Sequence, residues 1–273
     1  MNDSCDISEF EVKYIVIPKV IHYCWFGHGQ KPKLAEKCIR SWKKYCPDYQ
    51  IIEWNEENFD LSASPLYVRQ AYEAKKWAFV TDYVRLDVVY QYGGIYMDTD
   101  VELKKPLDML LERSAYFGFE NGNTIATGLG FGAEKGIFIL KELMDDYVDI
   151  PFVKKDGTYD LLPCPQRNIN VFLKYGIQLD NSMQVLPGNI LILPSIYLCP
   201  IDSVMKIRTY SHETISIHWF DASWQDNRKQ MHQKQRIDLM IYYFKQGVKY
   251  IIGEKVYERL KKLYRRGFAD ASN

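Results

Sequence analysis

The chain has 273 residues, of which 47% are hydrophobic and 26% charged, a balance typical of a globular protein with a sizeable core. Basic and acidic residues both number 35, so the whole-chain charge gives no indication of nucleic-acid binding. The N-terminal residues lack the pattern of a signal peptide, and no segment approaches the roughly 20 apolar residues that span a bilayer. With six cysteines and no C-x-x-C pair, these features predict a cytoplasmic protein with free thiols.

The first part of the chain predicts a strand, a helix and a second strand, followed by two further helices. Residues 16–25 alternate like a strand, 33–45 have apolar groups at helical spacing, and 49–54 read as a strand again. A unit of this kind predicts a parallel sheet with a right-handed crossover. Residues 65–74 and 76–92 are then expected to be helical.

The helix 76–92 ends in a Gly-Gly turn, and a short strand, 95–97, leads into Asp98, Thr99 and Asp100. Burying an unpaired charge is costly, whereas hard divalent cations prefer oxygen ligands, so these carboxylates favour a metal site. The two-residue period of a strand predicts that Asp98 and Asp100 point to the same side. We expect at least one of them to bind Mn²⁺ or Mg²⁺, with the phosphates of a nucleotide as further ligands.

The rest of the chain alternates further predicted elements and ends in a basic segment. Residues 228–266 contain twelve lysines and arginines but only three acidic residues, and the basic residues alternate with apolar ones. This pattern is typical of an amphipathic helix on an anionic membrane, and a solvated helix packed on the domain is the alternative. We expect one domain, 1–227, and a helical extension, 228–273. The remaining expected strands are 115–120, 126–131, 185–191 and 215–219, and the remaining helices are 136–147 and 166–175.

The composite of helix, Gly-Gly turn, strand and Asp-x-Asp between residues 77 and 106 resembles the sugar-nucleotide site of DXD glycosyltransferases. The most similar group is related to the yeast initiating α-1,6-mannosyltransferase and to bacterial capsular polysaccharide sugar transferases. The glucosylating domain of clostridial toxins is more distant. The resemblance extends from Ile17 to Trp224 and implies a GT-A-like α/β fold, with a Rossmann-type nucleotide-binding sheet and a helical C-terminal extension.

The resemblance also implies a function. The expected reaction moves a hexose from a nucleotide diphosphate sugar, with UDP favoured over GDP, to a glycan or lipid-linked glycan acceptor, with retention of configuration. That reaction belongs to surface polysaccharide synthesis, including capsule synthesis, and implies a location in the cytoplasm or at the inner face of the cell membrane.

The resemblance assigns roles to several residues. It places Asp82 on the ribose hydroxyls or the sugar and Arg85 on the sugar or diphosphate, as expected of a carboxylate and a guanidinium. Trp25 takes the position of a tryptophan that stacks on uracil, and Tyr96 belongs to the same nucleotide-sugar site. Together with Arg85, the two aspartates of the Asp-x-Asp are the expected catalytic residues.

A late segment, 216–224, resembles the part of the family that completes the metal shell. His218 is therefore a candidate third ligand, which suits Mn²⁺ better than Mg²⁺, and Ser223 or Trp224 is a candidate diphosphate contact. Weaker candidates for the acceptor side or the anomeric centre are Asn121, Asn123, Thr127, Gly128, Gln166, Arg167 and Asn168.

Structural roles remain open for these residues. Asp82 and Arg85 have the spacing of an ordinary helical ion pair. Core packing is the alternative role of Trp25, and His22 is expected to be a core histidine. Two other functions also remain: a non-catalytic sugar-binding protein of the same fold, and a metal-dependent phosphatase of the haloacid dehalogenase type. The phosphatase pattern requires Thr or Val where this chain has Glu102.

Overall fold

The computed structural model describes residues 16–120, 123–202, 208–221 and 256. Most of them belong to one compact unit, residues 1–201 and 209–224, and a second unit comprises 202–208 and 225–273. The predicted basic helix therefore lies outside the described residues, apart from Val256. The division into a domain, 1–227, and an extension, 228–273, stays a proposal.

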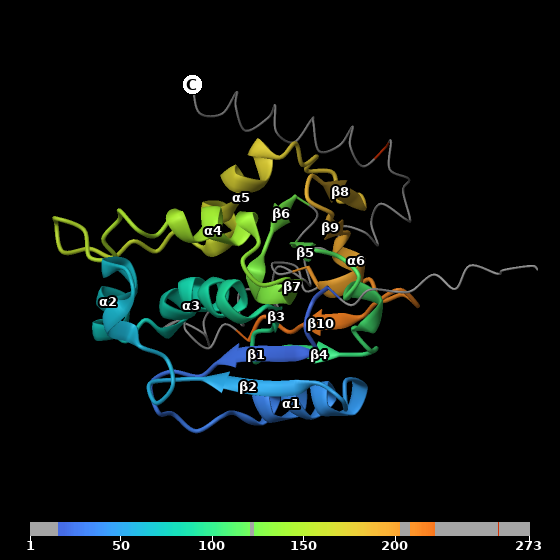
Figure 1. Cartoon of the computed structure of the whole chain (residues 1–273), viewed down its shortest axis with the longest axis horizontal. Helices are drawn as coiled ribbons and strands as arrows, with labels where there is room; N and C mark the ends of the chain where they lie inside the picture. The colour runs from blue at the N-terminus through green and yellow to red at the C-terminus, as the bar shows by residue number, and fades with distance from the viewer. Residues whose placement is uncertain (1–15, 121–122, 203–207, 222–255, 257–273) are drawn as a thin grey trace, which may run out of the picture. The chain divides into compact units, whose positions relative to one another are not determined.

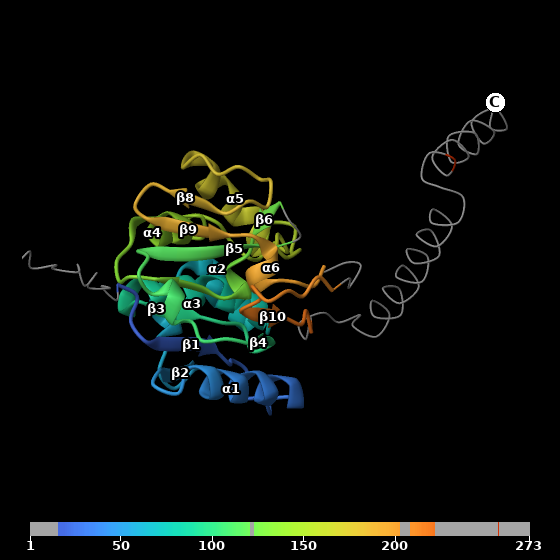
Figure 2. The same cartoon turned by 90° about the vertical axis from the view of Figure 1, so that its right-hand side faces the viewer.

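Within the described residues, the larger unit is built on a mixed eight-stranded sheet with the order β2-β1-β3-β7-β5-β9-β8, and β6 paired to β5. Figure 2 shows this order from β2 at the bottom to β8 at the top. A separate two-stranded sheet joins β4 to β10. The strands are β1 (Val20–Cys24), β2 (Gln50–Trp54), β3 (Gly94–Tyr96), β4 (Val101–Leu103), β5 (Ala115–Glu120), β6 (Thr124–Ile125), β7 (Phe131–Ala133), β8 (Gln184–Leu186), β9 (Ile190–Leu193) and β10 (Ser216–His218).

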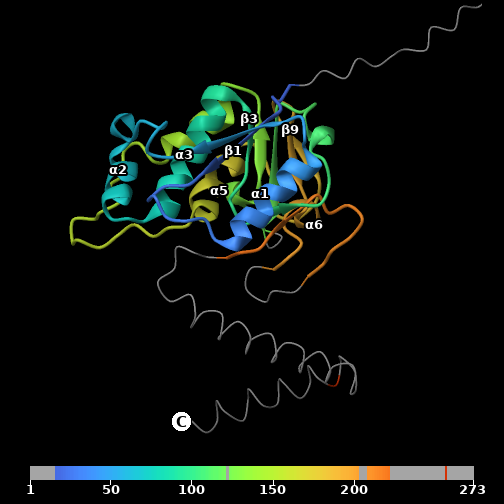
Figure 3. The same ribbon diagram turned by 90° about the horizontal axis from the view of Figure 1, so that it is seen from below.

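Helices cover both faces of the sheet. One core lies on the side of α2 to α5 and includes Phe172, and the other lies on the side of α1 and α6 and includes Trp42. Successive residues of β3 face opposite cores, since Ile95 belongs to the core that includes Trp42 and Tyr96 to the core that includes Phe172. The view from below shows α1 and α2 on different sides (Figure 3). The helices are α1 (Lys33–Tyr45), α2 (Leu66–Glu73), α3 (Trp77–Tyr92), α4 (Phe138–Asp145), α5 (Cys164–Lys174) and α6 (Ser195–Leu198), with 3₁₀ turns η1 (Leu61–Ala63), η2 (Asp108–Leu110) and η3 (Thr127–Leu129).

The predicted α/β class is confirmed, and so is the parallel strand–helix–strand unit at its start. β1 pairs in parallel with β2 and also with β3, while α3 packs beside both β1 and β3 (Figure 1). His22 of β1 is a satisfied core histidine, as expected: the Trp54 indole donates to its Nδ1 at 3.0 Å, and its Nε2 lies 2.8 Å from the Gly93 carbonyl oxygen.

Two strand predictions are wrong. The stretch 126–131 contains the 3₁₀ turn η3, and the strand β7 begins only after Gly130, whose φ of +108° takes the backbone out of the strand region. The stretch 185–191 is divided between β8 and β9 by a turn at Gly188 and Asn189, where both residues have positive φ. Glycine-rich apolar segments have the composition of strands, but their backbone freedom permits turns.

The Asp-x-Asp segment also differs from its prediction. β3 ends at Tyr96, and Asp98 and Asp100 lie in a turn before β4, closed by a 3.0 Å hydrogen bond from the Val101 N–H to the Asp98 carbonyl. The two-residue strand period is therefore not what brings these side chains together. The chain leaves the large sheet at this point, because β4 pairs with β10 instead.

In the part of the chain that the structure describes, no helix combines the length and the apolar character required to span a membrane.

Candidate metal and nucleotide-sugar site

The candidate site lies at the carboxyl edge of β1 and β3. Because these strands are parallel, Trp25, which follows β1, and Asp98, which follows β3, lie at the same edge. The Met97 N–H donates to the His22 carbonyl at 3.1 Å, so the pairing continues to the residue before Asp98. Open α/β sheets bind their ligands at this edge.

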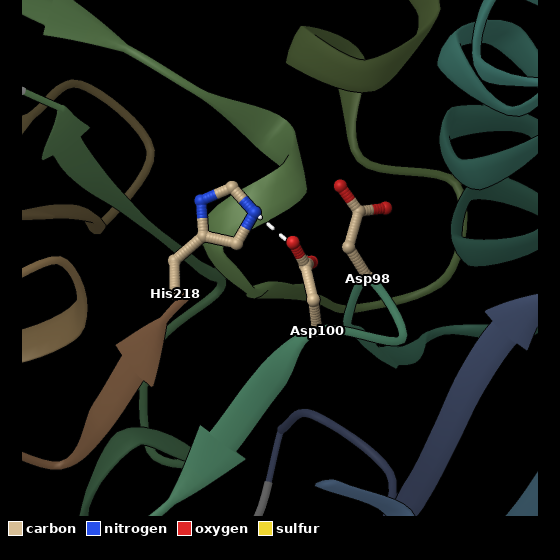
Figure 4. A group of neighbouring side chains, drawn as sticks. All are labelled: Asp98, Asp100 and His218. Atoms are coloured by element: carbon tan, nitrogen blue, oxygen red, sulfur yellow. Dashed lines mark ion pairs between the residues drawn. The ribbon is translucent and has the colours of Figure 1, made fainter. Parts of the chain in front are cut away.

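Three of the predicted residues converge here. One ligand atom each of Asp98, Asp100 and His218 lies within 4.8 Å of the others, with Asp100 between its two neighbours (Figure 4). His218 Nε2 lies 3.1 Å from Asp100 Oδ1, and the Asp221 N–H donates to Asp100 Oδ2 at 2.8 Å. His218 reaches this position because β10 pairs with β4 and sets His218 opposite Val101.

Arg85 joins this cluster to the helix α3. Its guanidinium is 4% exposed, and its Nη2 lies 3.1 Å from Asp82 Oδ1 and 3.4 Å from Asp98 Oδ1. The guanidinium also donates to the carbonyl and the hydroxyl oxygen of Thr81, and it lies 5.1 Å from the centre of the Tyr96 ring. The Tyr96 hydroxyl donates to Asp98 Oδ1 at 3.0 Å. The predicted Asp82–Arg85 pair is therefore buried and directed at the Asp-x-Asp.

The pKa shifts of Asp82 and Asp98, beside Arg85, differ from those of Asp100 and His218. Burial raises the pKa of Asp82 to about 6, and it also raises the pKa of Asp98, although the charge of Arg85 opposes both shifts. Burial acts in the same direction on Asp100, but the positive charge and hydrogen bond of His218 hold its pKa below the usual value. Burial lowers the pKa of His218, yet Asp100 and, to a smaller extent, Cys199 together keep that pKa well above the ordinary value. Asp100 and His218 thus form an ion pair.

These side chains fit a divalent cation. Two carboxylates and an imidazole within 4.8 Å of one another are donors that Mn²⁺ accepts once His218 has lost the proton of its ion pair, and the carboxylates alone suit Mg²⁺. Arg85 and the Tyr96 hydroxyl hold Asp98 in place, while the Asp221 amide holds Asp100. Outer contacts of this kind orient metal ligands in proteins.

Gly128 makes room for this arrangement. A Cβ atom at this position would lie 2.3 Å from Asp98 Oδ2 and 2.9 Å from Arg85 Nη1, both far inside van der Waals contact. Its carbonyl also accepts from the Asp98 N–H at 3.4 Å. The sequence suggested Gly128 only as an acceptor-side residue, whereas the structure places it against the carboxylate and the guanidinium.

The Gly128→Ala variant is expected to bind Mn²⁺ about 10- to 100-fold more weakly, because the new methyl group displaces the Asp98 carboxylate. Calorimetric titration of Mn²⁺ measures the effect. Gly118→Ala on β5 is the control, since its added Cβ meets the end of the flexible Leu198 side chain at 2.9 Å and none of the metal-site residues. Equal Mn²⁺ affinity in the two variants would contradict the assignment.

The other predicted residues have different positions. Trp25 is half-buried, and its indole N–H donates to the Gly29 carbonyl at 2.6 Å. On α5, Asn168 is fully buried, with neither amide atom hydrogen bonded within the described residues, and Arg167 pairs with Asp160 at 2.5 Å. Asn123 lies in the turn before β6. Ser223, Trp224 and Asn121 lie outside the described residues.

The first turn of α5 also reaches the site. The Thr127 hydroxyl donates to the Cys164 sulfur at 3.8 Å, and Cys164 is among the groups that act to lower the pKa of Asp82. The sequence indicated the neighbouring residues 166–168 as candidates, but no pattern in it connects Cys164 with Asp82 on α3.

Comparisons with known proteins agree with the site. A family described as "Glycosyltransferase sugar-binding region containing DXD motif" matches residues 32–117. Inositol phosphoceramide mannosyltransferase 1 of Schizosaccharomyces pombe is 30% identical over 110 residues, which are 37% of this chain and 33% of that protein. Mannosyltransferase 3 of the same organism is 33% identical over 108 residues, covering 37% and 29%. The chain spans about a third of the length of these relatives.

Among solved structures, a glycosyltransferase involved in glycosylation of the major capsid of PBCV-1 aligns with a TM-score of 0.45 and 15% identity, covering 79% of this chain and all of that one. The matched segment of the family, 32–117, contains α1, α3, Arg85 and the Asp-x-Asp. The sequence-based resemblance is thus confirmed, and residues 32–117 of this chain match the DXD-containing sugar-binding region of the glycosyltransferases.

Proposed function

We propose that the protein is a metal-dependent glycosyltransferase that moves a hexose from a nucleotide diphosphate sugar, preferably a UDP-sugar, to a glycan or lipid-linked glycan. The convergence of Asp98, Asp100 and His218, with the buried Arg85 directed at Asp98, carries the proposal. A cluster with one carboxylate pair, one imidazole and one guanidinium suits a diphosphate and its cation.

Each residue has a role in this proposal. Asp98, Asp100 and His218 would hold a divalent cation, which would supply positive charge to balance the charge developing on the departing diphosphate. Arg85 orients Asp98 and adds a positive charge beside the diphosphate. Asp82 accepts hydrogen bonds from sugar or ribose hydroxyls, and Trp25, half-buried at the same sheet edge, stacks on the base.

The proposed transfer retains the configuration at the sugar. The bond between the anomeric carbon and the diphosphate oxygen breaks, the acceptor oxygen bonds to the anomeric carbon, and the acceptor proton passes to the departing phosphate on the same face. In this scheme the protein positions the reactants and stabilises charge.

The relatives bear on donor and acceptor. The matching yeast proteins are named mannosyltransferases of inositol phosphoceramide, which supports a hexose donor and a lipid-linked acceptor. Trp25 supports UDP through its resemblance to a uracil-stacking residue. We extend the proposal to surface polysaccharide synthesis and to contact of the basic segment 228–273 with anionic membrane at the inner face of the cell membrane, which sedimentation with anionic liposomes tests.

A donor screen tests the activity. The purified full-length chain, incubated with UDP- and GDP-hexoses and Mn²⁺ but no acceptor, is expected to release free nucleoside diphosphate by slow hydrolysis. Chelation by EDTA is expected to stop the release, and added Mn²⁺ to restore it, because the cation assists departure of the diphosphate. Chromatography of the nucleotides measures the product.

The same screen separates the alternatives. A non-catalytic sugar-binding protein binds a donor without turnover, and a phosphatase releases inorganic phosphate from phosphomonoesters. Either result, or release of nucleoside diphosphate that is unaffected by EDTA, would count against the proposal.

A further inference from the structure

The loop after β1 contains Trp25 and then turns sharply. Gly27 has φ of +89° and His28 has φ of +56°, so two successive residues adopt the left-handed conformation. The glycine tolerates this geometry, whereas a residue with a Cβ such as His28 adopts it only when its surroundings impose it. Contacts with neighbouring residues therefore hold this turn.

Glu56, in the loop after β2, contacts the turn directly. The Gly27 N–H donates to Glu56 Oε1 at 2.7 Å, and the Tyr72 hydroxyl of α2 donates to the same oxygen at 3.1 Å. His28 Nε2 lies 3.8 Å from that oxygen. Burial raises the pKa of Glu56, but the Gly27 amide and the Tyr72 hydroxyl are among the contacts that bring it below the ordinary value, so Glu56 is ionised.

The other side of the turn is covered by an aromatic ring. A Cβ atom on Gly27 would lie 2.6 Å from Cε2 of Trp77, so the indole of Trp77 packs directly on the Gly27 backbone. Trp77 is the first residue of α3, the helix that also bears Asp82 and Arg85. Glu56 and Trp77 thus both contact the Gly27 backbone and hold the turn.

The turn at Gly27 and His28 also fixes the orientation of the Trp25 indole. The Trp25 N–H donates to the Trp54 carbonyl at 2.8 Å, and its indole N–H donates to the carbonyl of Gly29, on the far side of the turn, at 2.6 Å. A shift of the turn therefore moves the acceptor that orients the indole ring. This coupling links Glu56 to Trp25 without any contact between their side chains among the described hydrogen bonds.

We propose that Glu56 is a positioning residue for nucleotide binding, which holds the turn at Gly27 and His28 and thereby presents Trp25 to the base. The inference rests on the proposed function, since it assumes that a nucleotide binds beside Trp25. Because Glu56 acts through the loop and not on the base, it affects all nucleotides alike.

Two measurements test this on the full-length chain. Without nucleotide, amide hydrogen exchange over residues 25–31 is expected to rise in Glu56→Ala and to stay near wild type in Glu56→Gln, whose amide oxygen still accepts from Gly27. In calorimetry with UDP and Mn²⁺, Glu56→Ala is expected to bind about 5- to 10-fold more weakly, the equivalent of one hydrogen bond. Glu57→Ala is the matched control, because Glu57 is the exposed neighbour.

A double variant isolates the coupling. If Glu56 acts through Trp25, then Glu56→Ala adds little to the loss of affinity already caused by Trp25→Ala. Unchanged exchange in Glu56→Ala, additive losses, or a changed ratio of UDP to CDP affinity would each overturn the inference. Absence of UDP binding to the unaltered chain would instead overturn the proposed function, while the exchange measurement still reports on the turn.

Discussion

The Asp98→Asn and Asp100→Asn variants are each expected to release nucleoside diphosphate from the donor sugar at least about a hundredfold more slowly, measured across a Mn²⁺ titration. Lewis-acid assistance is worth several kcal/mol, and about 1.4 kcal/mol corresponds to a tenfold change in rate. Asparagine preserves the shape of each side chain but removes the charge that attracts the cation. Asp100 also loses the ion pair with His218.

The matched control is Asp87→Asn, on the same helix as Arg85. Its carboxylate accepts from the Gln91 amide at 2.9 Å and takes no part in the metal cluster, so the rate is expected to stay near wild type. Thermal unfolding without metal checks that the variants are folded. Wild-type rates in both Asp98→Asn and Asp100→Asn would show that neither carboxylate serves the reaction.

The sequence predicted local features of the site well. Asp82 and Arg85 are three residues apart on a helix that is otherwise apolar, so their shared face and their burial follow from the helical period. The strand–helix–strand unit and the position of Trp25 at its edge follow from periodicity and from chain topology. These predictions depend on residues close together in the sequence, where the backbone geometry is known in advance.

Contacts between distant segments could not be derived in the same way. His218 meets Asp100 because β10 pairs with β4, a two-stranded sheet of which the sequence indicated only the later strand. Glu56 was missed because its partner, the Gly27 amide, is 29 residues earlier in the chain, and a lone glutamate in a loop has no pattern. Gly128 was assigned to a strand, since an apolar run with glycines matches both a strand and a 3₁₀ turn.

Arg85→Met is expected to reduce both stability and activity. Arg85 is the positive charge shared by the buried Asp82 carboxylate, at 3.1 Å, and the partly exposed Asp98 carboxylate, at 3.4 Å, and methionine leaves Asp82 without its ion-pair partner. Removing one partner of a buried ion pair costs about 3–5 kcal/mol, which corresponds to a fall in melting temperature of about 10 °C for a chain of this size. Differential scanning calorimetry without metal measures it.

Two further variants distinguish charge from geometry. Arg85→Lys keeps the charge but lacks the planar guanidinium that bonds Thr81 while it pairs with Asp82 and Asp98, so it is expected to recover part of the stability and little of the activity. Arg40→Met removes an exposed arginine whose partner Glu36 is 3.9 Å away, and is expected to cost less than about 1 kcal/mol. If Arg85→Met melted like Arg40→Met, the guanidinium would not be compensating the acidic side chains beside it.

Metal binding brings a second positive charge to Asp98. Added Mn²⁺ is therefore expected to restore part of the melting temperature of Arg85→Met, and to raise it by more than it raises that of the wild type.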